Sequence, residues 1–279
     1  MKNFRTTFAL SLVTLLTTTV RAHDHPDVHL HVNPRWKECS FQLDPSLTQS
    51  AWKQFTREAG LVTYFRPLTD ARPMGRGKVE LSLLKWQSGI DETKDAWNNT
   101  FVHPDSTHWL VDGPHLAFPG LSLRTGLNRK MDLGLYWTQS PGANYGFYGA
   151  QLQYNLVNDS IYNWALSTRA SYVSIYGPPD VAFNNAGFDL LASKTIRFRY
   201  NWLSVSPYAY ASVCFAHGHE KSNVVNLKDE NVFGFQGAVG ASANISIVRL
   251  GIEYNMARIN TLSYKIGIGY NFGSGKKRR

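Results

Sequence analysis

The sequence predicts an all-β fold: an antiparallel, up-and-down transmembrane β-barrel of about ten strands, preceded by a short N-terminal helical segment. Three observations predict it. The last strand alternates strictly between large apolar residues and small or polar residues. The same alternation recurs in many earlier segments, and the connections between these segments are alternately short and long. Successive side chains of a strand point to opposite faces, so such strands offer one face to lipid and one to a lumen.

The final strand, 260–272, carries the clearest pattern. Its apolar series is Leu262, Tyr264, Ile266, Ile268, Tyr270 and Phe272. Lys265 and two glycines lie between these residues. An aromatic residue at the end of a transmembrane strand is typical of the membrane interface.

The N-terminus has the features of a secretory signal peptide over residues 1–22. Lys2 and Arg5 precede a mostly apolar run from Phe8 to Val20, and Ala22 completes a small-residue cleavage site. The run is shorter than the roughly 20 residues of a spanning helix, although an uncleaved anchor is the alternative. Cleavage would lower the formal charge from +9 to about +6.

Residues 23–76 are expected to form a periplasmic N-terminal segment with one short helix. Asp44 and Pro45 resemble a helix start, apolar residues follow at helical spacing, and Gly60 is a plausible stop, which predicts a helix over about 46–58. The helix could lie on the membrane, plug the lumen or cap the periplasmic mouth. Residues 66–77 are rich in Pro and Gly and are expected to form a connection.

The barrel itself is expected over residues 77–272. Its candidate strands are 78–88, 116–126, 130–138, 144–155, 162–175, 184–195, 200–216, 231–245, 247–257 and 260–272. A twelve-stranded alternative would add Leu61–Arg66 and one further N-terminal segment. No other run approaches a transmembrane helix, so a membrane-spanning chain must form a closed barrel.

The connections predict the orientation. Short ones lie near 127–129, 157–161, 194–199 and 246, and longer ones at 89–115, 139–143, 177–183 and 217–230. Long loops of such barrels lie outside the cell and short turns in the periplasm, so Phe272 would end in the periplasm. The loop 89–115 is acidic and contains or adjoins Trp86, Trp97 and Trp109, which could form an adhesion or ligand surface but are interpreted as an interfacial girdle.

Over residues 78–272 the chain resembles the small outer-membrane β-barrel proteins of Gram-negative bacteria. That resemblance implies the cell outer membrane as location, and outer-membrane lipid and the barrel-assembly machinery as partners. It also implies that Tyr264, Ile266, Ile268, Tyr270 and Phe272 form the assembly signal. The basic tail, 273–279, departs from the family, in which this signal usually ends the chain.

Charged residues of both signs fall on the inward faces. The lumen-facing candidates are Glu80, Arg124, Lys130, Asp132, Arg169, Asp189, Arg249, Glu253 and Lys265. They could form a charged constriction that selects solutes, or they could neutralise one another in a packed lumen. Ten strands are close to the eight at which side chains fill a barrel, which favours internal pairing with at most a narrow path.

Other candidate chemistry is weaker. Four histidines between His23 and His31 could gather metal ions, but a disordered tract binds weakly, and neither a metal nor a cofactor is expected. His217, His219 and Ser222 are the residue types of a hydrolase without evidence of the necessary geometry, so no enzyme activity is expected. Cys39 and Cys214 could pair, although nothing brings them together. No nucleic-acid-binding pattern is present.

The sequence therefore favours a narrow pore or transport-related, porin-like barrel for small solutes. The alternatives are a structural or surface-interaction barrel without a pore and, less favoured, a lipid-modifying enzyme. Oligomeric state and solute are left open. A charge on the lipid face, as in Ile266→Arg, is expected to harm assembly far more than Lys265→Ser.

Overall fold

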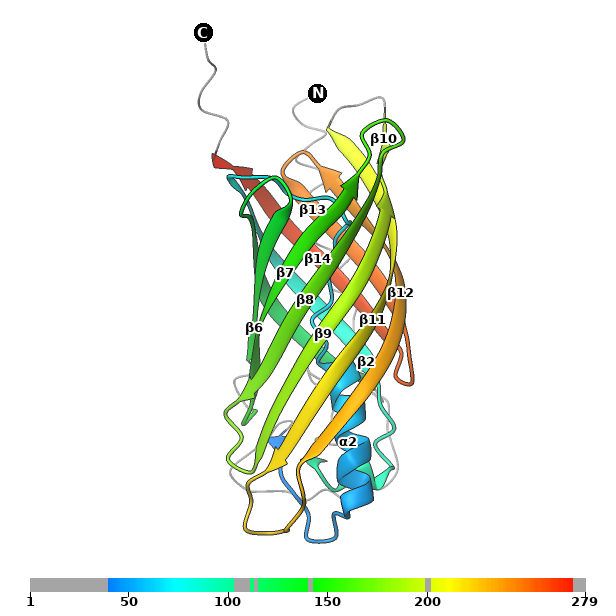
Figure 1. The fold of residues 1–279 in the computed structure, drawn as a ribbon. Helices are drawn as coiled ribbons and strands as arrows, with labels where there is room; N and C mark the ends of the chain where they lie inside the picture. The colour runs from blue at the N-terminus through cyan, green and yellow to red at the C-terminus, as the bar shows by residue number, and fades with distance from the viewer. Residues whose placement is uncertain (1–39, 103–110, 113–114, 140–142, 199–201, 273–279) are drawn as a thin grey trace.

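The computed structural model describes residues 40–102, 111–112, 115–139, 143–198 and 202–272. Its main feature is a closed antiparallel barrel of ten strands, which confirms the predicted fold class (Figure 1). The barrel strands are β2 (Lys78–Gly89), β5 (His115–Gly126), β6 (Met131–Gln139), β7 (Gly146–Asn158), β8 (Trp164–Tyr176), β9 (Val181–Lys194), β11 (Leu203–Glu220), β12 (Glu230–Ile245), β13 (Val248–Met256) and β14 (Thr261–Asn271).

Each barrel strand pairs with the next barrel strand along the chain, and the pairing of the last strand with the first closes the ring. β14 pairs with β2 along its whole length, from Thr261 opposite Ser88 to Asn271 opposite Lys78. β9 pairs with β11 directly, because β10 (Ile196–Arg197) is only a short extension beside β11. The strand pairing is therefore up-and-down throughout, as the alternating connections predict.

Two ends of the barrel are distinguished by their connections. At one end, called here the short-turn end, β2 begins and β14 ends. The opposite end, called the long-loop end, carries the connections β2–β5 and β11–β12. In the first of these lie α3 (Asp95–Asn98), β3 (Phe101–Val102) and β4 (Val111–Asp112), of which β3 pairs with β1 (Ser40–Phe41).

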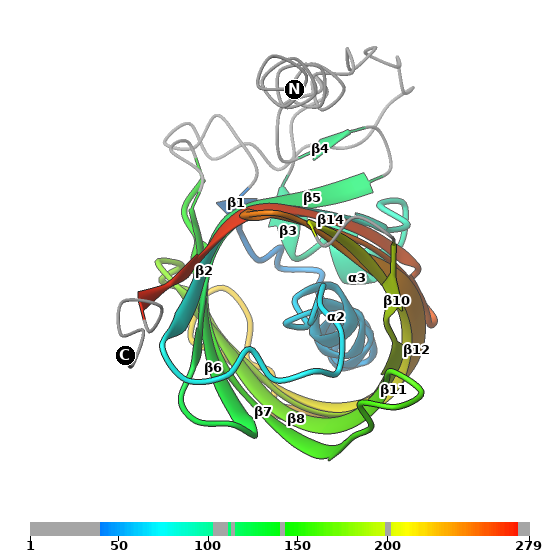
Figure 2. The same ribbon diagram turned by 90° about the horizontal axis from the view of Figure 1, so that it is seen from above.

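The N-terminal helix α2 (Gln49–Val62) lies inside the barrel, as the view along the barrel axis shows (Figure 2). It packs mainly on β11 and β12, and the chain continues through the lumen to the start of β2. Of the three placements that the sequence left open, the structure shows the lumen. Residues 40–76 therefore do not form a body apart from the barrel, because their apolar side chains find their packing partners inside it.

The helix boundaries differ from the prediction for physical reasons. Thr48 is the N-cap, and its hydroxyl accepts a hydrogen bond from the Ala51 amide. Asp44 instead caps a turn by accepting from the Ser46 amide. Gly60 does not end the helix: an added Cβ there would lie 2.7 Å from the Ala216 Cβ, so this glycine allows α2 to approach β11.

No residue between 61 and 66 is in a strand, so the twelve-stranded alternative is wrong; Leu61 and Val62 form the last turn of α2. Among the residues that the structure describes, no helix is long and apolar enough to cross a membrane.

Many large apolar side chains lie on the outer surface. They include Leu81, Leu83, Trp137, Tyr148, Phe188, Phe233, Phe235, Ile252, Ile268 and Tyr270, each roughly 45–75 % exposed. The last strand follows the predicted alternation: Ile268, Tyr270 and Phe272 are 60 %, 61 % and 70 % exposed, while Lys265 is buried. An apolar exterior around buried charged residues is the distribution that a lipid surrounding favours.

Candidate functional site: the occupied lumen

The lumen is the candidate functional site, and the structure places most of the predicted charged residues in it. Seven of the nine are buried: Glu80, Arg124, Asp132, Arg169, Asp189, Glu253 and Lys265. Lys130 is an exception, because it is exposed in the turn that precedes β6. Arg249 is half-buried near the short-turn end, where its guanidinium donates to the backbone oxygens of Ser246 and Val248.

Six of the seven buried charges form ion pairs across neighbouring strands. The Lys265 ammonium is 2.6 Å from Glu80 and the Arg124 guanidinium 2.5 Å from Asp132. Arg169 pairs with Asp189, and the Tyr64 hydroxyl also donates to Asp189. The charges therefore neutralise one another, which is the packed-lumen interpretation, and removing one partner would leave the other buried and unpaired.

Glu253 is the seventh buried charge, and hydroxyl groups hold it. Its carboxylate accepts hydrogen bonds from Tyr208 (2.9 Å) and Tyr210 (2.7 Å) on β11. The backbone amide of Leu68, in the internal segment, donates to it as well (3.2 Å). Glu253 thus joins the barrel wall to the chain inside it.

Arg66 is the residue that sequence reasoning missed. Arg66 is 1 % exposed, and its guanidinium donates to the backbone oxygens of Leu61 and Val62, in the last turn of α2, and of Tyr64 just beyond the helix. It also donates to Asn255 and Thr261 on the wall and lies over the Trp86 ring. A cation at this end complements the helix dipole and satisfies carbonyls that the helix leaves free. The sequence signal was only an arginine shortly after a helix, beside Pro67.

The internal segment, residues 49–77, contacts the wall at successive levels. Near the long-loop end the Gln49 amide donates to Glu230 (2.6 Å). Farther into the lumen the Gly60 oxygen accepts a hydrogen bond from Asn185 (2.6 Å). Towards the short-turn end the Ala71 amide donates to Ser193 (3.0 Å) and the Met74 amide to Asp132 (3.0 Å). The segment is therefore fixed along its whole length rather than at one point.

Glycines on the inward faces make room for this segment. A side chain at Gly187 would collide with Tyr64, one at Gly234 would approach Leu61, and one at Gly218 would meet Thr56 at 2.6 Å. In the alternating pattern these positions read simply as small lumen residues. Their spatial role depends on the internal segment.

Aromatic packing fills the long-loop end of the lumen. Trp52 stacks on Phe55 (ring centroids 5.6 Å apart), and Phe55 contacts Trp97 of α3 and Phe41 of β1 edge-on at 5.1 and 5.9 Å. The Trp97 indole also donates to Glu58 on α2 (2.7 Å). The predicted girdle is therefore wrong for Trp97 and for Trp86, which are 2 % and 1 % exposed, because the internal segment offers them an apolar surface. Trp109 lies outside the described residues.

The histidines of β11 lie at the rim. His217 contacts Asn231 (2.9 Å) and His219 contacts Asp229 (2.6 Å), and the His219 hydrogen bond holds the pKa of the Asp229 carboxyl below its usual value. The Ser222 hydroxyl accepts from the amides of Val224 and Val225. No hydrogen bond joins Ser222 to either histidine in the part of the chain that the structure describes.

Metal and disulfide expectations are tested only in part. No cluster of three or more His, Cys, Asp or Glu residues that could hold a metal ion occurs among the residues described. The tract His23–His31 lies outside them, as does Cys39. Cys214 is buried and free.

No family model and no curated protein matches the sequence. Among solved structures, an outer membrane channel from Pseudomonas putida F1 is similar over 74 % of this chain and 100 % of its own, with 11 % identity and a TM-score of 0.42. The β domain of the Bordetella autotransporter Brka is similar over 71 % and 100 %, with 12 % identity and a TM-score of 0.40. Neisserial surface protein A is similar over 70 % and 96 %, with 10 % identity and a TM-score of 0.32. At such identities the likeness concerns the fold alone, and it singles out no subfamily.

Proposed function

We propose that this chain is an outer-membrane β-barrel protein with a closed lumen: a structural or surface-interaction barrel rather than an open pore. The observation that carries the proposal is the internal segment, which runs through the lumen and is hydrogen-bonded to the wall at successive levels. The membrane location rests on the apolar exterior and on the placement of the charged strand residues inside the barrel, where they are paired.

Two features support closure. The aromatic cluster around Phe55 fills the long-loop end, and burying each such side chain stabilises the packed state by about 1.5–3 kcal/mol. Deeper in the lumen, a cavity beside Arg66 and Lys265 has a volume of about 10 Å³, room for about one water molecule. A narrow pore for small solutes would require the internal segment to move.

The long-loop end is the surface that the proposal assigns to contacts with partners. α3, β3 and β1 lie there: Trp97 and Phe41 contact α2 directly, and Phe101 contacts both of these rings. An end held in this way presents a fixed surface, so binding there would require little ordering of loops. No enzyme activity is proposed, because Ser222 and the two rim histidines each bond to other groups.

Recordings in planar bilayers test the proposal. The full chain should insert without single-channel steps, because the lumen is filled. Regular steps of one conductance from the full chain would contradict it.

A matched pair of variants asks whether the lumen contents cause the closure. Phe55→Ser, which removes a ring of the lumen cluster, should produce intermittent openings. Phe235→Ser removes a ring that is 75 % exposed on the exterior and should stay silent. If Phe55→Ser inserts, shows heat-modifiable migration and remains as silent as Phe235→Ser, the barrel is closed for another reason.

A further inference from the structure

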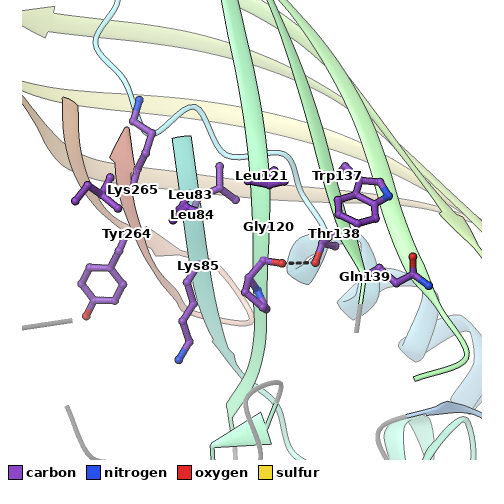
Figure 3. Close-up of a pocket in the computed structure, with 12 residues that line it drawn as sticks. Leu83, Leu84, Lys85, Gly120, Leu121, Trp137, Thr138, Gln139, Tyr264 and Lys265 are labelled. Atoms are coloured by element: carbon purple, nitrogen blue, oxygen red, sulfur yellow. Dashed lines mark hydrogen bonds between the residues drawn. The ribbon is translucent and has the colours of Figure 1, made fainter. Parts of the chain in front are cut away.

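An amphiphilic groove lies on the outside of the barrel, across β14, β2, β5 and β6 (Figure 3). Its volume is about 420 Å³, and its outward-facing lining includes Leu83, Leu121, Trp137, Ile266, Tyr264 and Lys85. These side chains lie outside the barrel and do not line the lumen. The groove therefore calls for an occupant that reaches the barrel from outside.

The strand register sorts the lining into two rows. Leu83 pairs with Ile266 on one side and with Leu121 on the other, and Leu121 pairs with Trp137, which gives an apolar row. One step nearer the long-loop end, Lys85 lies between Tyr264 and Pro119. The groove is thus apolar toward the middle of the barrel and carries a cation and a phenol hydroxyl toward the long-loop end.

The charge of Lys85 has no partner among the residues that the structure describes. The ammonium makes neither an ion pair nor a hydrogen bond with any residue that the structure describes, whereas Lys265 on the adjacent strand is paired with Glu80. In Figure 3 the Lys85 and Tyr264 side chains extend in the same direction. The outward residue beside Lys85 on β5 is Pro119, which is short, so the ammonium stands at the edge of open space.

We propose that this groove binds a bilayer lipid with an anionic phosphate headgroup, in the leaflet at the long-loop end. An acyl chain would lie along Leu83, Leu121, Ile266 and Trp137, and the phosphate would accept from the Lys85 ammonium and the Tyr264 hydroxyl. Charge complementarity favours an anionic lipid as the occupant. The groove is apolar with a cation at one end, which matches an acyl chain joined to an anionic headgroup and does not match an apolar protein surface. The proposal rests on the proposed membrane location.

Quenching of Trp137 fluorescence by brominated lipids tests the proposal in vesicles that contain the full chain. The Trp137 component is the difference between the wild type and Trp137→Phe. Acyl-brominated phosphatidylglycerol is compared with acyl-brominated phosphatidylcholine at equal mole fraction. We expect the anionic lipid to associate about fivefold more strongly at this residue, the factor that one lysine near an anionic lipid surface supplies. The preference should decline as salt is added.

Three variants, each paired with its own Trp137→Phe reference, assign the preference. Lys85→Gln should reduce the ratio of anionic-lipid to phosphatidylcholine association to about one, and Lys85→Arg should retain the wild-type ratio. Lys194→Gln, at the opposite end of the barrel on β9, should leave it unchanged.

The outcomes separate the two proposals. Equal quenching by both lipids in the wild type, or a preference that survives Lys85→Gln, overturns the lipid site and leaves the membrane barrel standing. If neither brominated lipid quenches Trp137, the residue does not face lipid, and the membrane location itself is contradicted.

Discussion

Glycines on the inward face have a role at the residue scale that the alternating pattern alone does not reveal. Gly187 on β9 faces Tyr64 of the internal segment, and a side chain there would overlap the tyrosine ring and the Ser171 hydroxyl. Gly237 on β12 lies on the outward face, in the same row as exposed Phe235 and Val239, and the only atom within 4 Å of an added Cβ there is the Tyr210 backbone oxygen, at 3.7 Å. A glycine that faces the filled lumen and one that faces outward therefore differ in their tolerance of a side chain.

Gly187→Leu should destabilise the folded barrel, and Gly237→Leu should not. Overpacking of a filled interior costs about 1–3 kcal/mol, whereas the Gly237 side chain would enter open space. Urea unfolding in lipid or detergent, followed by tryptophan fluorescence, measures the difference. Equal midpoints for the two variants would mean that Tyr64 does not occupy the lumen beside β9.

Arg66→Lys should destabilise the protein although it preserves the charge. The guanidinium donates to five oxygens at once, from three backbone carbonyls and from Asn255 and Thr261. A lysine has three donors on one nitrogen and cannot reproduce this fork. Hydrogen bonds to charged groups contribute about 1.5–3 kcal/mol each, so a fall of a few kcal/mol in the free energy of unfolding is expected. A wild-type unfolding curve for Arg66→Lys would show that charge alone suffices.

The buried charges show how far sequence reasoning reaches at this scale. Alternation places Glu80, Asp189 and Glu253 inward, because a strand allows only two faces. Their partners depend on strand register and on the internal segment, neither of which a single sequence specifies. Tyr64 and Leu68, which bond to Asp189 and Glu253, come from a stretch that forms no strand and whose place in the lumen the sequence does not indicate.

At the scale of elements, the strands were predictable and the internal segment was not. All ten predicted strands are present, with ends that agree to within a few residues, because a period of two over ten residues is a strong signal. The helix was predicted too, but its placement was not, since a helix with one apolar face suits a membrane surface and a lumen equally well.

The last strand gives a revised prediction for substitutions on its two faces. Ile266→Arg places a charge on the lipid face, at a cost of about 2–4 kcal/mol near the midplane. Lys265→Ser was expected to be mild, but Lys265 is the partner of buried Glu80, so this change leaves an unpaired carboxylate. Both should reduce the folded fraction.

The double variant Lys265→Met/Glu80→Leu removes both charges and should recover most of the loss caused by Lys265→Ser. Heat-modifiable migration on SDS gels gives the folded fraction of each variant. A double variant no more stable than Lys265→Ser would indicate that the pair does not act as a unit.

For the molecule as a whole, the barrel and its contents are expected to unfold together. Hydrogen bonds of Asp189, Glu253 and Arg66 join the wall to the internal segment. If either part unfolded alone, the other would keep buried polar groups without hydrogen-bond partners. The folded chain should migrate differently on SDS gels before and after boiling, with strand-dominated circular dichroism. Loss of the tryptophan signal from α2 in a separate, earlier transition would show that the segment melts independently.

The path of the internal segment also makes the molecule mechanically directional. The chain enters the lumen at the long-loop end and leaves it as β2 at the other, so the segment is threaded rather than inserted. It can be withdrawn only toward the long-loop end, because in the opposite direction it is continuous with the wall. A pulling force applied ahead of Ser40 should therefore draw out α2 before any strand parts. The same force applied beyond Asn271 should peel β14 from β2 and β13 first and open the cylinder at its seam.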